Sequence, residues 1–222
     1  MLAACHRNVR HLDVDGAPPG PRAKLEITLL DDKVDPLAGL VTEPPAGTSI
    51  EEENVPGGPG TYDRVHYARI APQPGETLEQ AATRLAASLA SLPLPPSHRF
   101  VVGPISGDER WGHGTPVAMR SYLATGDAIV RETDVADAAA SDGPDPVVLV
   151  TLTAAAAARF EAATTASVRR RIAIVVDDRV LSAPVVQAPI RGGRLSITLG
   201  TFASPRAKRA EAQGLAHALG GR

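Results

Sequence analysis

The sequence is poor in the residues on which many enzyme and membrane sites depend. It has one cysteine, and aromatic residues make up only 3% of its 222 positions. A single cysteine excludes an intramolecular disulfide and any multi-cysteine metal site, and the scarcity of rings argues against an aromatic-lined cofactor pocket. No segment reaches the ~18 to 20 consecutive apolar residues of a transmembrane helix. The core must therefore rest on Ala, Val, Leu and Ile.

The sequence also lacks an excess of basic charge. Its formal net charge is −2 and its pI is about 6.3, which leaves no electrostatic footprint for nucleic acid or an anionic membrane surface. The only basic run, residues 169–171, follows a predicted helix. We interpret these arginines as cations that complement the C-terminal end of the helix dipole. We expect no nucleic-acid partner.

The one cysteine, Cys5, ends a Leu-Ala-Ala-Cys sequence at residues 2–5. This sequence fits a bacterial lipobox, in which Cys5 would carry the lipid, although the charged and apolar parts of a signal should precede it. The alternative is chance, since the chain is rich in alanine. If the box is real, translation starts upstream of Met1 and the lipid is the only link to a membrane. Residues 6–22 have no periodic apolar face and end in a Pro-rich segment, so we expect residues 1–22 to be a flexible tether whether or not the box is real.

Residues 23–123 predict a unit that mixes strands and a helix. Residues 31–61 are acidic and rich in Pro and Gly, which indicates a long surface loop. Thr77 and Gln80 fit a capping box at the start of a helix, and Pro93 ends that helix. Runs of alternating or consecutive apolar residues predict strands near residues 25–29, 65–70, 99–102 and 117–123.

Residues 124–222 repeat this mixture. Helices are expected after caps at Thr153 and Ser204, and residues 177–179 fit the turn of a tight hairpin. The interleaving of hairpins and helices predicts an α+β fold with mostly antiparallel sheets, arranged as two small layered units that meet near residue 124. The first helix places one face toward the core, at Phe160, Thr164 and Val168. Strands are expected at residues 147–152, 172–176, 180–183 and 195–199.

Several sequence blocks of the second half occur in a fixed order. They read LATGDAI at residues 123–129, PVVLVTLT at 146–153, RIAIVVDDRVLSAPV at 171–185 and PIRGGR at 189–194. Together they resemble the head subdomain in the first extracytoplasmic domain of the SecD (SecDF) protein-export family, whose hairpin block reads RLAIVLDGKVLSAPV. The resemblance extends weakly into the first half through KLEITLLD at residues 24–31.

Three departures from the family pattern affect what the resemblance implies. Asp178 stands where the family has Gly at a position that favours positive φ, which Asp tolerates better than most residues. Leu199 looks like one extra residue, which predicts a bulge or a longer strand. The family's proton-coupled work depends on membrane helices with ionisable groups, and the sequence has no such segment. The resemblance therefore implies a module that lacks the family's proton-coupled activity.

Motifs for catalysis or metal binding are missing. Ser182 is not in a nucleophile elbow, the glycine-rich segments lack a P-loop, and the glutamates at residues 51–53 form a solvated face rather than a calcium loop. We expect no metal, no cofactor and no enzymatic activity, with a hydrolase that uses His113 and Asp108 or Glu109 as the less favoured alternative. The histidines do not fall at a metal-ligand or triad spacing; they are His6, His11, His66, His98, His113 and His217.

The resemblance implies recognition of protein. The partner would be an unfolded client chain or a translocon subunit, met by a sheet edge or an apolar groove, in the periplasm or at the envelope through a lipid anchor. An alternative with the same fold is an envelope lipoprotein that acts as a scaffold or assembly module. The contact candidates, which could instead simply fill the core, are Val180, Leu181, Ser182, Ala183, Pro184, Val185 and Val186.

Overall fold

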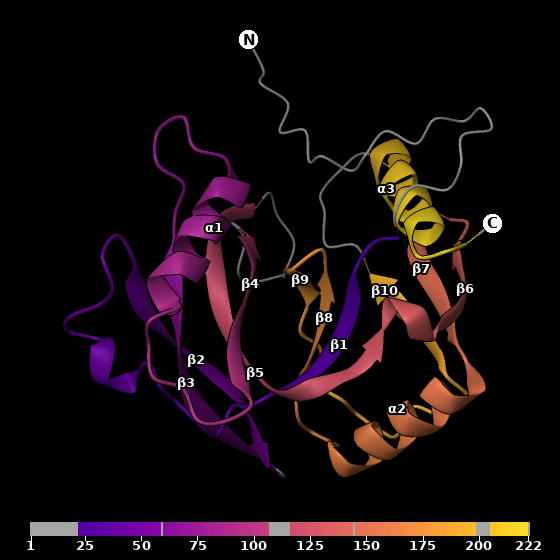
Figure 1. Ribbon diagram of the computed structural model, residues 1–222, viewed down its shortest axis with the longest axis horizontal. Coiled ribbons are helices and arrows are strands. Elements are labelled where there is room, and N and C mark those ends of the chain that lie inside the picture. The colour runs from indigo at the N-terminus through magenta and orange to yellow at the C-terminus, as the bar shows by residue number, and fades with distance from the viewer. Residues whose placement is uncertain (1–21, 59, 107–115, 144, 199–204, 222) are drawn as a thin grey trace.

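The computed structural model describes residues 22–58, 60–106, 116–143, 145–198 and 205–221. Over these residues the chain forms ten strands in two sheets and three α-helices (Figure 1). The strand pairings are antiparallel except for one parallel residue pair between Val102 and Arg179. The structure therefore confirms the α+β class with mostly antiparallel sheets.

The helices are α1 (Leu78–Leu89), α2 (Ala154–Ala166) and α3 (Pro205–Ala218). The strands are β1 (Leu25–Leu30), β2 (Ser49–Gly58), β3 (Thr61–Ile70), β4 (His98–Ser106), β5 (Pro116–Arg131), β6 (Val135–Ala140), β7 (Val147–Leu152), β8 (Ile172–Val176), β9 (Arg179–Ser182) and β10 (Arg194–Thr198).

The larger sheet closes on itself. Its seven strands run in the order β1-β8-β9-β4-β5-β3-β2, and β1 pairs a second time with β5. Strands β1, β8, β9, β4 and β5 therefore form a ring, and β3 and β2 extend from it. The interior is a small apolar cluster to which every strand of the ring contributes: Leu30, Ala173, Val175, Val180, Val101, Tyr122 and Ala124.

A glycine allows β4 and β9 to approach closely enough to close the ring. Gly103 on β4 lies so close to β9 that a Cβ there would be 2.8 Å from the Cβ and the carbonyl oxygen of Val180. Real side chains do not approach so closely, so any larger residue would push β9 away. Only the absence of a side chain lets β4 and β9 meet.

Strand β8 is buried on both faces. Ala173 and Val175 point into the ring, whereas Ile172 and Ile174 join the largest apolar cluster of the described residues. This explains why residues 172–176 read as an uninterrupted apolar run rather than an alternating one. The large cluster also takes side chains from the smaller sheet, whose order is β10-β7-β6, and from α2 and α3; among them are Phe160, Val148, Val150, Ile197, Ala216 and Leu219.

Helix α1 covers the other part of the larger sheet. Thr77 accepts a hydrogen bond from the Gln80 backbone, and the Gln80 side chain accepts one from the Thr77 backbone, which confirms the capping box. Leu85 and Leu89 are fully buried against β3, β4 and β5. The helix thus packs at the opposite end of the molecule from α2 and α3 (Figure 1).

Two expectations about secondary structure are wrong, and one strand was not predicted. Residues 31–61 are not one loop, because β2 occupies Ser49–Gly58 and pairs along its length with β3. Strand β6 was not expected at all. Val168 does not continue the buried face of α2, because the helix ends at Ala166 and Val168 is 38% exposed.

The hairpin between β8 and β9 is as expected. Asp177 and Asp178 have φ of 46° and 63°, so both central residues adopt the left-handed conformation of a type I′ turn. The expected bulge at Leu199 and the Ser204 cap lie outside the described residues. The division at residue 124 stays a prediction; β5 passes through it, and β8 and β9 lie in the same sheet as β4.

Candidate functional site

The predicted contact segment, residues 180–186, lies along and just after β9. Val180 is 1% exposed inside the ring and Val186 is 3% exposed in the large apolar cluster. Pro184 is exposed, and the remaining four residues are half-buried. Two of the seven side chains are thus closed to a partner and five are at least partly accessible, and the role of the segment in contact stays a prediction.

The backbone of this segment already has partners. Strand β9 pairs with β8 on one side and meets β4 on the other. Beyond β9, the carbonyl of Pro184 accepts a hydrogen bond from Ile172, and Val186 exchanges backbone hydrogen bonds with Arg169 and Arg170. An incoming chain would have to compete with these bonds, so strand addition here would cost existing pairing.

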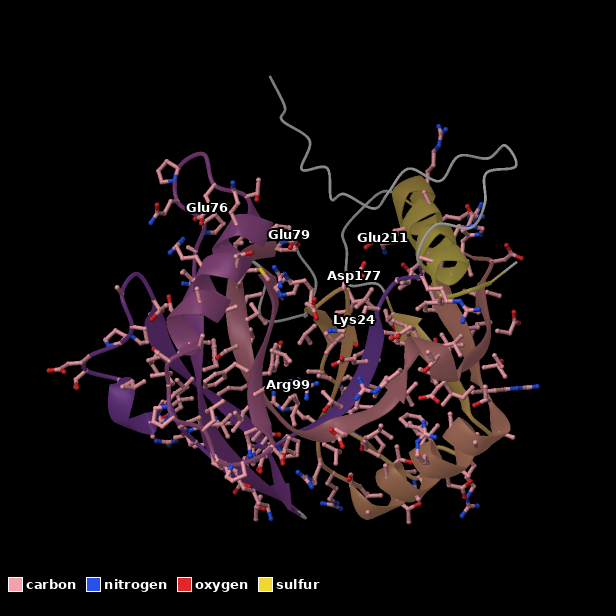
Figure 2. The ribbon with its side chains drawn as sticks, viewed as in Figure 1. Lys24, Glu76, Glu79, Arg99, Asp177 and Glu211 are labelled. Carbon is pink, nitrogen blue, oxygen red and sulfur yellow. The ribbon has the colours of Figure 1, made fainter. Side chains whose placement is uncertain are left out.

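The tip of the β8–β9 hairpin is fastened to the start of β1. The Lys24 backbone donates to the Asp177 carboxylate at 3.0 Å, its Nζ lies 2.6 Å from Asp178, and the Asp177 backbone donates to the Lys24 carbonyl. Figure 2 shows Lys24 directly below Asp177, between α1 and α3. Arg179 further pairs with Glu79 at the start of α1, at 3.1 Å. These contacts hold the turn in place on the surface.

Two arginines form ion pairs that connect β2 with segments far from it in the sequence. Arg171, just before β8, binds Asp32 through two nitrogens at 2.9 and 2.6 Å, and Glu53 on β2 at 3.0 Å. Glu53 also accepts a short hydrogen bond from Arg120 on β5. We call Asp32, Glu53, Arg120 and Arg171 the arginine cluster. Arg171 is one of the three arginines of residues 169–171, and its pairing with Asp32 and Glu53 shows that the interpretation as a cation at the helix end is wrong for this residue.

Aromatic rings cover the arginine cluster. The Arg120 guanidinium stacks over Tyr67 at 3.7 Å and over Tyr122 at 4.6 Å from the ring centroids. Such cation–π contacts add most where water is excluded, and the Arg171 side chain is only 9% exposed. Glu53 is therefore part of an internal ion-pair network, so the expectation that residues 51–53 form a solvated face is wrong for Glu53.

The surroundings of the arginine cluster stabilise the ionised form of Glu53 and the neutral form of Tyr122. Burial alone would raise the pKa of Glu53, but hydrogen bonds and charge from Arg120 and Arg171 outweigh it and hold the pKa below its usual range. Burial raises the pKa of Tyr122 above its ordinary value. Near neutral pH these groups keep one protonation state, so they are suited to tie strands together rather than to transfer protons.

Two histidines are hydrogen-bonded to aspartates. His98 Nε2 lies 3.0 Å from Asp31, and His66 Nδ1 lies 2.7 Å from Asp35. Among the described residues no three His, Cys, Asp or Glu side chains gather as metal ligands would. His113, with the acidic residues proposed beside it, and Cys5 lie outside the described residues.

The surface beside the arginine cluster has a modest depression. It measures about 210 Å³ and is lined by residues including Lys33, Gly57 and Arg170. This is below the roughly 300 to 1,000 Å³ of most small-molecule sites. Within the described part of the chain, no helix is both long and apolar enough to cross a bilayer.

The family model of the SecDF P1 head subdomain matches residues 109–221. A solved structure of "a membrane component SecDF that enhances protein export" is 20% identical, with a TM-score of 0.37 over 89% of this chain and 92% of that one. SecDF in a super-membrane-facing form is 18% identical, with a TM-score of 0.37 over 93% of this chain and 30% of that one.

A third structure, the translocon-associated SecDF of Thermus thermophilus, is 20% identical, with a TM-score of 0.34 over 90% of this chain and 29% of that one. The chain thus spans less than a third of the two longer SecDF chains. No curated protein matches it. The family model covers just over half of the 222 residues, including the hairpin block and the strands and helices around it. The chain therefore belongs to the SecDF family, through a P1 head subdomain at residues 109–221.

Proposed function

We propose that this protein is a non-catalytic module that works outside the cytoplasm in protein export, where it binds an unfolded client chain or a translocon subunit. The observation that carries the proposal is the match of residues 109–221 to the SecDF P1 head. SecDF is described as a membrane component that enhances protein export and as translocon-associated. Kinship within the family supports the same process for this chain.

The chemistry of the described residues supports a binding role over catalysis. Catalytic acids and bases need pKa values near the working pH, whereas Glu53 is held ionised by two arginines. The depression beside it is small for a substrate pocket. Recognition through backbone and surface suits a partner that varies in sequence, because every polypeptide offers the same N–H and C=O groups.

A binding assay with an unfolded probe tests the proposal. A fluorescently labelled secretory protein, reduced and carboxymethylated so that it cannot refold, is titrated with the purified chain, and the native form of the same protein serves as the control. We expect fluorescence anisotropy to rise with the unfolded probe and to stay flat with the native one. A parallel titration uses the purified translocon in detergent.

The proposal fails if neither the unfolded probe nor the translocon binds. The envelope-scaffold alternative makes that prediction, and it further predicts that crosslinking in envelope fractions traps assembly proteins instead of export components. The two functions are therefore separated by the identity of the trapped partner. Both use the same fold, so the fold alone does not choose between them.

A further inference from the structure

The strand edges of this molecule are protected unequally. The outer edge of the larger sheet is β2, which carries the glutamates at residues 51–53, Pro56 and a bulge before Gly58. Charges, proline and bulges are the usual means by which proteins prevent unwanted strand pairing. The opposite end of that sheet has no edge, because β1 pairs with β5.

The smaller sheet has one protected edge and one open edge. On β6, the register shifts between Val135 and Asp137, and Gly221 lies so close to the Ala138 carbonyl that a Cβ there would overlap its oxygen. On β10, the register with β7 is continuous from Arg194 to Thr198, without proline or bulge. Within the described residues, β10 has no strand on its other side.

The backbone of β10 directs alternate residues to that open edge. The backbone N–H of Leu152 donates to the carbonyl of Gly193 at 2.8 Å. Gly193 and Leu152 are therefore a hydrogen-bonded pair, next to the pair of Arg194 and Thr151 that begins the ladder of β10 and β7. Bonded and non-bonded pairs alternate in an antiparallel ladder, so Leu195 and Ile197 form the bonds to β7. The residues whose N–H and C=O groups point outward are Arg194, Ser196 and Thr198, and their side chains are also exposed.

The charge near β10 favours an acidic partner. Residues 187–198, which lead into β10 and form it, contain two basic residues, Arg191 and Arg194, and no acidic one, although the whole chain has a net charge of −2. Arg191 pairs with Glu161 at 3.4 Å, whereas no carboxylate among the described residues pairs with the exposed Arg194. Opposite Ser196, Leu149 on β7 is 49% exposed and adds an apolar contact for a neighbouring strand.

We propose that the open edge of β10 takes up an extended, proline-free polypeptide segment of acidic character as a fourth strand of the smaller sheet. The segment pairs with the outward N–H and C=O groups of Arg194, Ser196 and Thr198, and Arg194 binds its carboxylates. This inference rests on the proposed function, and it places the contact on β10 rather than on residues 180–186. Strand addition of this kind reads little sequence, which suits a module that meets many clients.

The decisive variant is Ser196→Pro in the full chain. Proline removes the outward N–H and its ring blocks the edge, while the bonds of Leu195 and Ile197 to β7 remain. The matched control is Ser196→Ala, which loses the same hydroxyl and keeps the N–H. The probe is a labelled twelve-residue peptide of alternating valine and threonine with two terminal glutamates.

We expect Ser196→Pro to weaken peptide binding at least tenfold and Ser196→Ala to bind within twofold of the native protein. Amide exchange measured by NMR should show new protection at Arg194, Ser196 and Thr198 when the peptide binds. Equal binding by Ser196→Pro, or unchanged exchange at these amides, would overturn the proposal. Because Ser196→Pro could fail to fold, a peptide N-methylated at alternate residues provides the same test on the unaltered protein, where weaker binding is expected.

The outcomes separate this inference from the proposed function. If Ser196→Pro binds the carboxymethylated probe as well as the native protein does, strand addition at β10 is wrong while the client-binding function stands. If the native protein binds neither that probe nor the translocon, the function itself is wrong. If the native chain is a dimer and Ser196→Pro is a monomer in sedimentation, the occupant of the edge is a second copy and the proposal is overturned.

Discussion

The two sheets share one apolar cluster but end differently. In the larger sheet the strands close into a ring, and the remaining edge strand β2 carries charges, a proline and a bulge. In the smaller sheet β10 keeps a regular edge that no described strand covers. Both sheets are therefore stabilised by burial in the shared cluster, but among the described residues only the smaller sheet leaves a regular strand edge with available backbone groups.

The connection between the sheets runs through β8. Its Ile172 and Ile174 face the cluster shared with the smaller sheet, and its Val175 faces the interior of the ring. A strand buried on both faces cannot leave one layer without disturbing the other. We therefore expect the two sheets to unfold together, although the open edge belongs to only one of them.

The largest effect is expected from Phe160→Ala, which breaks the packing of the smaller sheet. Phe160 is 1% exposed in the shared cluster, and truncating such a ring costs about 3 to 5 kcal/mol of the free energy of unfolding. Urea unfolding should still show one transition, because β8 couples the sheets. The comparison variant Leu85→Ala, under α1, should shift the same transition. Two separate transitions would instead support a division of the chain near residue 124.

The next effect is expected from Arg171→Ala, which breaks the arginine cluster. Without Arg171, Asp32 loses its bidentate partner and Glu53 keeps only Arg120. Removing one member of a buried ion pair costs about 3 kcal/mol or more. The control is Arg170→Ala, since the Arg170 side chain donates to the Leu30 carbonyl at 3.3 Å and its loss should cost about 1 kcal/mol. Equal losses in urea unfolding would show that the cluster adds no special stability.

The hairpin block and α1 could be predicted from the sequence because their signals are local. The capping box lies within four residues, and the turn at Asp177 and Asp178 depends on the conformational tolerance of those two side chains. Strand β2 could not be predicted in this way. Its glutamates are paired with residues of other strands, such as Arg64 for Glu52 and Arg120 for Glu53, so its polar sequence resembles a loop until those partners are known.

The backbone pairing of the contact candidates at residues 180–186 could not be predicted from the sequence, for a related reason. The sequence block around Pro184 drew attention because it resembles the family, but resemblance does not reveal which backbone groups are already paired. The availability of β10 follows from what lies beside it in space, and a short segment such as residues 194–198 carries no mark of being an edge. Arg171 showed no signal either, because its partners Asp32 and Glu53 are more than 100 residues away in the chain.

The smallest effect is expected from His98→Gln, which probes a titrating contact of the ring. His98 begins β4 and pairs with Asp31, just after β1, at 3.0 Å. The hydrogen bond that His98 donates to the Asp31 carboxylate raises the pKa of His98 above its ordinary 6.5. Burial would raise the pKa of Asp31, but the hydrogen bonds from His98 and from the Lys33 backbone, together with the charges of Arg170 and His98, outweigh burial and lower the pKa below its ordinary value.

The signs of these shifts fix the pH window. The raised pKa of His98 contributes stability that is complete below about pH 6.5 and is lost as pH rises through the higher folded value; the lowered pKa of Asp31 contributes stability above about pH 4 that is lost on acidification. His98→Gln should therefore reduce the free energy of unfolding by about 1 kcal/mol near pH 5.5 and have little effect near pH 9. Asp31→Asn should give the same pH profile. A loss independent of pH would mean that His98 acts by packing alone.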